Sequence, residues 1–485
     1  MIKIEDASFS YNGKEGNGIK NVNITIKKGE CILLTGRSGC GKTTIIRMIN
    51  GLIPNFYSGD LRGSIKIDKK NILDMPMYEI AEKVGSVFQN PRTQFFNVDT
   101  DSEIAFGIEN LSYPYEKLKE CVEKTKNDLH IEKLMGRSIF ELSGGEKQKI
   151  AFSSIYAMSP DIYVLDEPSS NLDVDATMEL RDNLMMLKKQ GKTIIIAEHR
   201  LYYLKDIIDK AVYVDNGEIK KIYTKEEFVE IPEEQRIEMG LRVMNLSSIV
   251  PLENKKKSKK HTLKIDNMST YYKNKVIMDN ISVGAARGEI IGIIGHNGAG
   301  KSTFLRSVCG LHKGCSGSFL WDGKKVNKKQ RLKLSYMVMQ DVNYQLFAES
   351  VEQECYLGIK NPDTEIVKQV MKELKIYQYK NRHPNTLSGG QKQRTAVAVS
   401  MICNKEILVF DEPTSGLDFG SMKQVTKLFT KLASMGKIIF VVTHDYEFIS
   451  SVCNRIFHFD DGMLKDDFLL NDKNEKKLKE FFIVS

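Results

Sequence analysis

The sequence predicts an α/β fold that is repeated along the chain, with a parallel β-sheet at the core of each copy. Three observations predict it. At 485 residues, the chain is longer than a single hydrophobic core usually serves. One ordered set of glycine-rich, acidic and histidine motifs occurs in both halves. Short apolar runs, such as 194–197, end in polar residues, as buried parallel strands do where they face a ligand.

The two copies of the motif set have nearly constant spacing. From the serine motif to the histidine, no net insertion separates them, which indicates that one domain has been duplicated. The equivalent residues lie 259 positions apart for Lys42 and Lys301, 251 for Gln89 and Gln340, and 245 for Ser143 and Ser388, Asp166 and Asp411, and His199 and His444.

Composition favours a globular protein of the cytoplasm. Apolar residues make up 41% and charged residues 28%, and the longest apolar runs have the length of strands. The start of the chain lacks the apolar stretch of a secretion signal. Eight cysteines without CxxC spacing predict reduced thiols instead of a zinc site or disulfides. Cys40 lies within a glycine-rich loop; it is expected to be a tolerated small residue, or else a thiol whose oxidation blocks ligand entry.

Turn and charge signals divide the chain into a first domain at 1–224, a helical connector with a lysine-rich linker at 225–262, and a second domain at 263–485. The segment 212–219, with its Asn216-Gly217 turn, predicts the hairpin that closes the first domain. The run at 255–260 carries five lysines. It is expected to be a solvated linker, with contact to anionic lipid or nucleic acid as the alternative.

Each copy is expected to follow a strand–loop–helix order. An apolar strand at 31–35 precedes a loop at 36–41 and a helix at 43–50, and the strand at 290–294 with a helix from Ser302 repeats this order. Further buried strands are predicted at 162–165, 193–197, 407–410 and 438–443.

The loop between strand and helix matches the phosphate-binding pattern GxxxxGK[ST]. Glycines let backbone N–H groups converge on phosphates, the lysine reaches the β- and γ-phosphates, and the hydroxyl binds Mg²⁺. The residues assigned to the nucleotide are Gly36, Arg37, Ser38, Gly39, Cys40, Gly41, Lys42, Thr43 and Thr44 in the first half, and Gly295, His296, Asn297, Gly298, Ala299, Gly300, Lys301, Ser302 and Thr303 in the second.

Paired carboxylates follow one strand in each half. In a phosphate-loop enzyme the first acid helps to hold Mg²⁺ and the second can polarise the attacking water as a general base. Asp166 and Asp411 are therefore assigned to the metal, together with Thr43 and Ser302. Glu167 and Glu412 are assigned as catalytic bases.

Further polar residues recur at matching places beyond the loop. His199 and His444 each lie 32 residues after the predicted base, so both are expected to contact the γ-phosphate and the attacking water. Gln89 and Gln340 are assigned to Mg²⁺ and water contact. The segments Ser143, Gly144, Gly145 and Ser388, Gly389, Gly390 precede helix-like stretches, where a helix start forms a second anion site in each half.

These motifs resemble those of the ATP-binding cassette (ABC) ATPases over almost the whole chain. The resemblance implies two tandem P-loop nucleotide-binding domains, each with a parallel-sheet core, a small antiparallel β-subdomain and a helical subdomain, and with ATP and Mg²⁺ bound. It also implies that the halves pair, so that each phosphate loop faces the serine-glycine motif of the other half. Asp173 and Asp418 match the loop that crosses between the sites. Tyr11 and Tyr271 match the aromatic that stacks on adenine, with Tyr272 an equally placed candidate.

A finer resemblance points to the energy-coupling-factor (ECF) importers of vitamins and micronutrients. Its marks are the segments 87–96, 101–110 and 197–201. It implies an integral membrane scaffold subunit, a substrate-binding membrane subunit and a place at the cytoplasmic face of the cell membrane, with no nucleic acid as partner. The second half departs from this pattern at 339–345. Four acids after the glutamines, Asp101, Glu103, Glu349 and Glu352, are expected either to receive scaffold arginines or to face solvent.

Two other functions remain open. One is a tandem ABC ATPase that acts on ribosomes, although such proteins usually carry a longer basic segment between their lobes. The other is a tandem sugar-importer ATPase, a type in which one half is commonly degraded, whereas both halves here keep their loop, serine-glycine motif, base and histidine.

Overall fold

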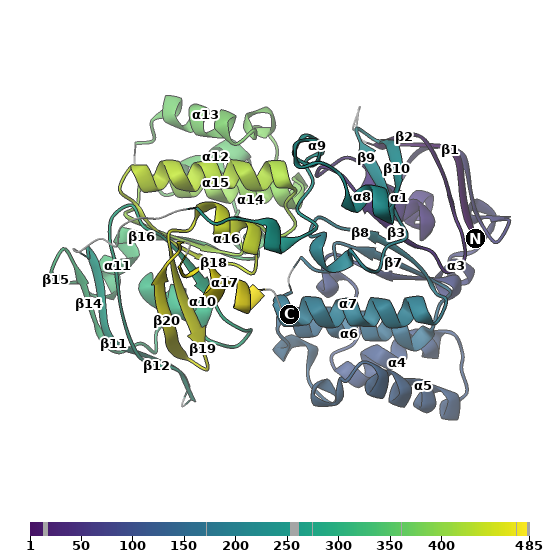
Figure 1. Ribbon diagram of the computed structural model, residues 1–485, viewed down its shortest axis with the longest axis horizontal. Helices are drawn as coiled ribbons and strands as arrows, with labels where there is room; N and C mark the ends of the chain where they lie inside the picture. Colours follow the sequence, from purple (N-terminus) through teal and green to yellow (C-terminus); the bar gives the residue numbers. More distant parts are fainter. Residues whose placement is uncertain are drawn as a thin grey trace. The chain divides into compact units, whose positions relative to one another are not determined.

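The computed structural model describes residues 1–12, 18–170, 172–252, 261–273, 275–359, 361–471 and 473–482 (Figure 1). Asn171 and the lysine-rich run at 255–260 lie outside the described residues. The chain forms two compact units, Met1–Met244 and Asn245–Ser485. Each unit is an α/β structure that combines a six-stranded sheet with a four-stranded antiparallel sheet.

The first unit has a mostly parallel sheet of strand order β10-β9-β3-β8-β7-β6. Only the terminal hairpin of β9 and β10 is antiparallel, and it corresponds to the predicted closing hairpin. The strands are β3 (Cys31–Thr35), β6 (Val84–Val87), β7 (Ile162–Asp166), β8 (Thr193–Ala197), β9 (Lys210–Asp215) and β10 (Glu218–Thr224).

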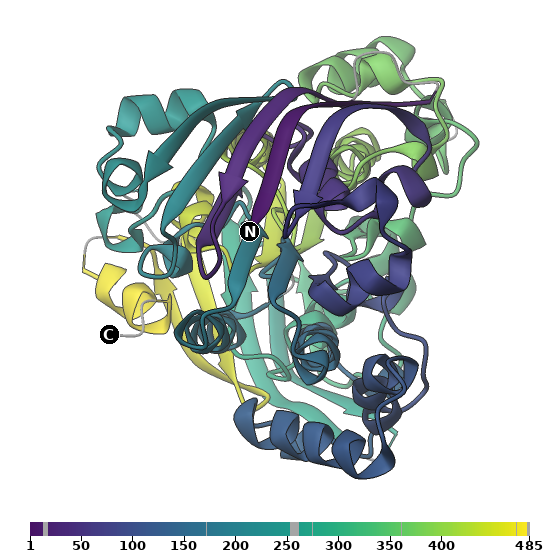
Figure 2. The same cartoon turned by 90° about the vertical axis from the view of Figure 1, so that its right-hand side faces the viewer.

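An antiparallel sheet of order β2-β1-β4-β5 and two groups of helices complete the first unit. Figure 2 shows β1 and β2 as long neighbouring purple ribbons. The strands are β1 (Ile2–Tyr11), β2 (Gly18–Ile26), β4 (Gly59–Ile67) and β5 (Lys70–Asn71). The helices are α1 (Lys42–Ile49), α2 (Leu52–Asn55), α3 (Met77–Lys83), α4 (Thr100–Asn110), α5 (Tyr115–Asp128), α6 (Gly144–Met158), α7 (Val174–Lys189), α8 (Lys225–Val229) and α9 (Glu233–Met239).

The second unit repeats this plan. Its larger sheet has the order β16-β17-β18-β13-β19-β20 and its antiparallel sheet the order β12-β11-β14-β15. The strands are β11 (Leu263–Tyr272), β12 (Lys275–Ala285), β13 (Ile290–Ile294), β14 (Ser318–Trp321), β15 (Lys324–Lys325), β16 (Ser335–Val338), β17 (Ile407–Asp411), β18 (Ile438–Val442), β19 (Arg455–Asp460) and β20 (Met463–Leu469). The helices are α10 (Lys301–Val308), α11 (Lys328–Leu334), α12 (Val351–Tyr356), α13 (Thr364–Glu373), α14 (Gly389–Ile402), α15 (Phe419–Ser434), α16 (Tyr446–Val452) and α17 (Glu475–Phe482).

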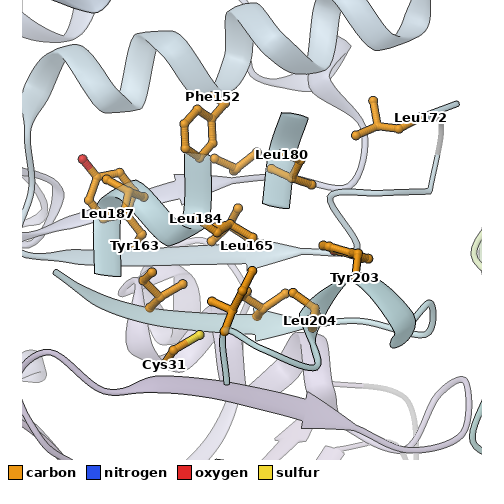
Figure 3. Packing of buried hydrophobic residues seen from close by; sticks show 14 of the residues in the cluster. Cys31, Phe152, Tyr163, Leu165, Leu172, Leu180, Leu184, Leu187, Tyr203 and Leu204 are labelled. Carbon is orange, nitrogen blue, oxygen red and sulfur yellow. The ribbon is translucent and has the colours of Figure 1, made fainter. Parts of the chain in front are cut away.

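Central strands are buried on both faces because helices cover one side and the antiparallel sheet lies on the other. Every residue of β3, β7 and β8 is buried. Successive side chains of a strand point to opposite faces. Leu33 accordingly packs in the cluster that contains α7, and Leu34 packs in the cluster that contains β1 and β2. Figure 3 shows Leu180, Leu184 and Leu187 of α7 in the first of these clusters.

The helical part of the expected connector packs into the first unit. Phe228 of α8, Met239 of α9 and Leu241 are buried in the same core cluster as the central strands. The contacts therefore place the division of the chain at Met244, beyond these helices. Among the described residues, no helix combines the length and the apolar character that crossing a bilayer requires.

The α7 contact with the sheet predicts a stability effect. We expect Leu184→Ala, at a side chain with 0% exposure, to lower the free energy of unfolding of the first unit by about 2–5 kcal/mol through lost burial and an unfilled cavity. Denaturant unfolding measures this. The matched control is Leu73→Ala, whose side chain is 47% exposed, and an equal loss in both variants would contradict this packing.

Candidate functional site

Both phosphate loops run from the end of a central strand to the start of a helix. The loop of the first unit connects β3 to α1, and that of the second connects β13 to α10. Their first glycines cannot carry a side chain, since a Cβ at Gly36 would lie 2.1 Å from the Val214 carbonyl oxygen and one at Gly295 would lie 2.2 Å from that of Phe459. The loop thus lies close against the neighbouring strand, which leaves room for phosphate on its other side.

The loop lysines are buried and held by backbone carbonyls. Lys42 is 5% exposed, and its Nζ donates to the carbonyl oxygens of Gly36 at 3.0 Å and Arg37 at 3.1 Å. Lys301 is 7% exposed and donates to those of Gly295 at 2.6 Å and His296 at 2.9 Å. A buried ammonium held by backbone carbonyls is well placed to bind an anion such as a phosphate.

A hydroxyl and a carboxylate meet next to each lysine. Thr43 Oγ1 donates to Asp166 Oδ1 at 3.2 Å, and Ser302 Oγ donates to Asp411 Oδ2 at 2.9 Å. Burial raises the pKa of both carboxyls, against the lowering effect of the hydroxyl and of the nearby lysine. A hydroxyl with one carboxylate fits Mg²⁺, which takes its remaining ligands from phosphates and water. The described residues form no larger cluster of metal-binding side chains.

The two expected bases share an unusual backbone conformation. Glu167 has φ 47° and Glu412 has φ 52°, a left-handed region that residues with side chains seldom enter. Their amides bond the carbonyl oxygens of Ala197 at 2.8 Å and Val442 at 2.9 Å, at the ends of the neighbouring strands. Positive φ values also recur at equivalent turns such as Ser159 and Asn404, so this conformation shows that the two units build the turn after the aspartate alike.

The histidines lie beside these carboxylates. His199 Nε2 is 3.6 Å from Glu167 Oε1, and it is 3.4 Å from both Lys42 Nζ and Ser38 Oγ. His444 Nε2 is 3.7 Å from Glu412 Oε1. Each unit therefore brings its loop, acidic pair and histidine together at the carboxyl ends of the parallel strands, as the sequence predicts.

The glutamines differ between the units. Gln89 Nε2 donates to Glu167 Oε2 at 2.7 Å. Glu412 instead accepts from Thr443 Oγ1 at 3.1 Å and from the His444 amide at 3.1 Å. Gln340 is exposed at the end of β16. The glutamine thus contacts the expected base in the first unit, while in the second unit the histidine loop contacts it.

The serine-glycine motifs and the crossing-loop aspartates cap helices. Ser143 begins α6, where its hydroxyl accepts from the Glu146 amide at 3.3 Å and its own amide donates to Glu146 Oε2 at 2.8 Å. The Ser388 amide donates to Gln391 Oε1 at 3.0 Å at the start of α14. Asp173 and Asp418 are the N-caps of α7 and α15. These caps fix the helix starts that the sequence assigns to anion binding.

The aromatic residues lie at the ends of β1 and β11, which are inner strands of the antiparallel sheets. The Tyr11 hydroxyl is 3.2 Å from Thr44 Oγ1 and accepts from Arg47 at 3.1 Å, which joins this strand to α1. Tyr271 is 39% and Tyr272 65% exposed, at the end of β11. Both second-unit candidates for the adenine contact therefore stay open to solvent.

In each unit a buried glutamate holds the loop that follows the glutamine, and the sequence analysis did not identify these two glutamates. The Glu103 carboxylate is 2% exposed and accepts from the amides of Phe96 at 3.0 Å and Asn97 at 2.8 Å. Glu354 does the same for Phe347 and Ala348, both at 2.7 Å. The prediction that Glu103 faces solvent or a partner arginine is therefore wrong, because its charge is used within the loop. Glu103 and Glu354 lie 251 positions apart, the spacing of Gln89 and Gln340, and this signal could have revealed them.

The fold agrees with comparisons to known proteins. The family model described as ABC transporter matches residues 19–170 and 278–415. The chain belongs to the ABC transporter family. It is therefore an ATP-hydrolysing enzyme of the ABC ATPase type, with two ATPase domains in one chain.

Relatives of similar length support this membership. A protein of Treponema denticola named "Putative ABC transporter ATP-binding protein" is 47% identical over 99% of each chain. One of the same name from Methanosarcina mazei is 32% identical over 95% of this chain and 88% of its own.

Solved structures share the fold at low identity. A model of ribosome-bound archaeal Pelota and ABCE1 gives a TM-score of 0.70 at 20% identity, covering 95% of this chain and 78% of that one. RNase-L Inhibitor gives 0.65 at 20% identity, covering 98% and 93%. At this identity the likeness concerns the fold alone.

The buried acid of the first site predicts a conflict between stability and activity. Because burial raises the Asp166 pKa, its charged form destabilises the folded ligand-free protein at neutral pH. We expect Asp166→Asn to raise the Tm in magnesium-free buffer and to lower ATP hydrolysis. Thermal melting and an ATPase assay measure these effects, with Asp161→Asn, 62% exposed at its side chain, as the control. A lower Tm with normal hydrolysis would contradict the assignment.

Proposed function

We propose that this chain is the ATPase subunit of a membrane importer of the ECF type. It would drive the uptake of a vitamin or micronutrient through a membrane scaffold subunit and a substrate-binding membrane subunit. The observation that carries the proposal is an exposed apolar patch, Phe96, Val98 and Phe140, on the loops that follow Gln89 and that precede Ser143. These side chains are 76%, 62% and 78% exposed.

The patch is built on a fixed backbone. The Ile139 amide donates to the Val98 carbonyl oxygen at 2.8 Å, and Asp99 forms a β-bridge with Ser138. Phe96 stacks on Phe106 of α4, with ring centroids 4.9 Å apart. Large apolar side chains held rigidly in water are typical of a docking surface for an apolar partner segment. A cytoplasmic helix of a membrane scaffold is the partner that we propose.

The second unit offers a related but different surface. Tyr344 and Phe347 are 63% and 72% exposed, on the loop after Gln340. Gln345 pins this loop, since its side chain accepts from the Met339 amide at 3.1 Å and donates to the Tyr336 hydroxyl at 3.0 Å. An aromatic patch in each half supports two scaffold contacts that are not identical.

Contacts within the first unit link the loop that carries this patch to the proposed base and to α6. Gln89 and Gln94 lie on the same loop. The side-chain amide of Gln94 donates to the Ala151 carbonyl oxygen of α6 at 3.4 Å, and that of Gln89 donates to the Glu167 carboxylate. A partner that moves the loop would therefore displace both the proposed base and the helix that begins at Ser143. This linkage is how ATP hydrolysis would be coupled to the membrane subunits.

Within each half, we propose that the loop lysine and backbone amides bind the phosphates of ATP and that the acidic residue after the metal-binding aspartate accepts a proton from the attacking water. The hydroxyl and aspartate would hold Mg²⁺, which neutralises charge on the phosphates. The resemblance further implies that Ser143 serves the ATP held by Lys301 and that Ser388 serves the ATP held by Lys42.

Replacing both proposed bases tests the chemical assignment. We expect the double variant Glu167→Gln and Glu412→Gln to lose hydrolysis by about 100-fold or more, since a general base contributes on the order of 10²–10⁴. ATP binding should persist because the loops are intact. Phosphate release and equilibrium binding of labelled ATP measure the two effects. Near-normal turnover would exclude the base role, and Glu218→Gln, at an exposed carboxylate, is the control.

Co-purification tests the importer proposal. We expect the tagged chain to bring down integral membrane proteins from solubilised membranes, and the double variant Phe96→Ser and Phe140→Ser to lose them while the isolated chain keeps its ATPase activity. The control is Tyr115→Ser, an exposed aromatic on α5. Co-purification with ribosomes instead of membrane proteins would favour the ribosome-acting alternative and contradict the proposal.

A further inference from the structure

In each unit, the segment after the last strand of the larger sheet returns to the phosphate loop. This segment contains α9 in the first unit and α17 in the second. The strands that precede these segments, β10 and β20, end 245 positions apart, at Thr224 and Leu469. Because the segments follow equivalent strands, a contact that both make with the phosphate loop belongs to the repeated plan of the two units.

In the first unit, Arg37 joins the phosphate loop to the end of α9. Its guanidinium donates to the Glu238 carbonyl oxygen at 2.5 Å. Gly240, the C-cap of α9, lies so close that a Cβ there would be 2.9 Å from Arg37 Cγ. On β9, the Tyr213 hydroxyl donates to the Met239 carbonyl oxygen at 3.4 Å. The second residue of the loop and a residue of the neighbouring strand therefore hold the same helix end.

In the second unit, aromatic rings make the corresponding contact. His296 of the loop and His458 of β19 occupy the positions of Arg37 and Tyr213. Phe481 of α17 lies against both rings, with its centroid 5.4 Å from that of His296 and 5.2 Å from that of His458. These separations are those of aromatic pairs in contact. Burial lowers the pKa of His458, so its ring is mostly neutral at neutral pH and suits an aromatic contact.

Other contacts fix α17 on the second unit and so set the place of Phe481. Leu478 is 0% and Phe482 is 3% exposed. The Phe482 ring lies 5.5 Å from that of Tyr446, at the start of α16. The half-buried ring of Phe481 is therefore carried by a helix whose neighbouring apolar side chains are packed in the unit.

The loop residue that Phe481 contacts also holds the loop lysine. The His296 carbonyl oxygen accepts from Lys301 Nζ at 2.9 Å. The Arg37 carbonyl oxygen accepts from Lys42 Nζ at 3.1 Å in the first unit. A peptide whose side chain is held by a helix keeps its carbonyl directed at the lysine. Holding the loop in this arrangement before the nucleotide arrives reduces the ordering cost of binding.

We propose that Phe481 is a positioning residue for the second phosphate loop, which raises the affinity of that loop for ATP by packing on His296 and so holding the carbonyl that binds Lys301. The Glu238 carbonyl oxygen does the same for the first loop through Arg37. Helix α17 thus serves the second nucleotide site, and its effect is on binding. This inference rests on the proposed binding of ATP by the phosphate loops.

Nucleotide binding to chains with one intact loop tests the role of Phe481. Lys42→Ala leaves the lysine of the second loop, and Lys301→Ala leaves that of the first. We expect Phe481→Ala to raise the Kd of a non-hydrolysable ATP analogue by about three- to tenfold in the Lys42→Ala chain, the effect of roughly one aromatic pair. In the Lys301→Ala chain the Kd should stay unchanged. The control is Lys476→Ala, at an α17 side chain that is 88% exposed, which should leave both Kd values unchanged.

Conservative variants separate the ring from its bulk. Phe481→Tyr keeps the ring and should retain the Kd of the Lys42→Ala parent. Phe481→Leu keeps an apolar side chain without a ring and should raise the Kd nearly as much as Phe481→Ala does. In the chain with both lysines, Phe481→Ala should raise the KM for ATP and leave kcat at saturating ATP nearly unaltered, because the bound phosphates then hold the lysine in place.

Thermal melting of every variant accompanies these measurements. An unchanged Kd for Phe481→Ala in the Lys42→Ala chain, or the same rise in Kd in both single-lysine chains, would overturn the inference. A Phe481→Leu chain that binds as tightly as Phe481→Tyr would also overturn it, since the ring would then be only a part of the core. Analogue binding that neither lysine replacement weakens would instead overturn the proposed ATP sites themselves, so the two failures are distinguishable.

Discussion

The structure depends on burying opposite charges at the end of an otherwise apolar sheet. In each unit a buried lysine donates to backbone carbonyl oxygens and a buried aspartate accepts from a hydroxyl, at the place where the parallel strands end. Such charges cost stability unless an ion of opposite sign or a metal joins them. The glycine loop, the strained glutamate and the packed histidine all surround this place. In the proposed function, a nucleotide with Mg²⁺ binds at this place.

Both units bury this lysine and aspartate in the same fold. They differ in the contacts that the proposed base and the histidine loop make with neighbouring loops. The first unit ties its proposed base to the glutamine loop and holds the histidine loop with Glu198. The second uses the proposed base itself as an anchor. The glutamine loops are pinned alike by Glu103 and Glu354, but they expose different aromatic residues. A duplicated ATPase thus acquires two sites that need not respond equally to one partner.

The sequence predicts the motif-bearing elements well because their glycines, lysines and acids are needed for local geometry. The strand at 31–35 is confirmed, and the helix expected at 43–50 forms one residue earlier as α1. Side-chain partners could not be predicted in the same way. Glu103 looks like a surface acid in the sequence, and only the folded loop shows that two backbone amides surround it. The difference between the histidine loops could not be predicted for the same reason. The His199 amide donates to Glu198 and the His444 amide to Glu412, and the sequence does not show which carboxylate each amide reaches.

The number of nucleotides that one chain binds tests the central claim most directly. The claim is that each half builds a competent phosphate site around its buried lysine. Equilibrium dialysis of the purified 485-residue chain with a non-hydrolysable ATP analogue and Mg²⁺ measures this number. We predict two bound nucleotides per wild-type chain. Lys42→Ala should lose one of them, and Lys301→Ala should lose the other. A single nucleotide per wild-type chain would contradict it.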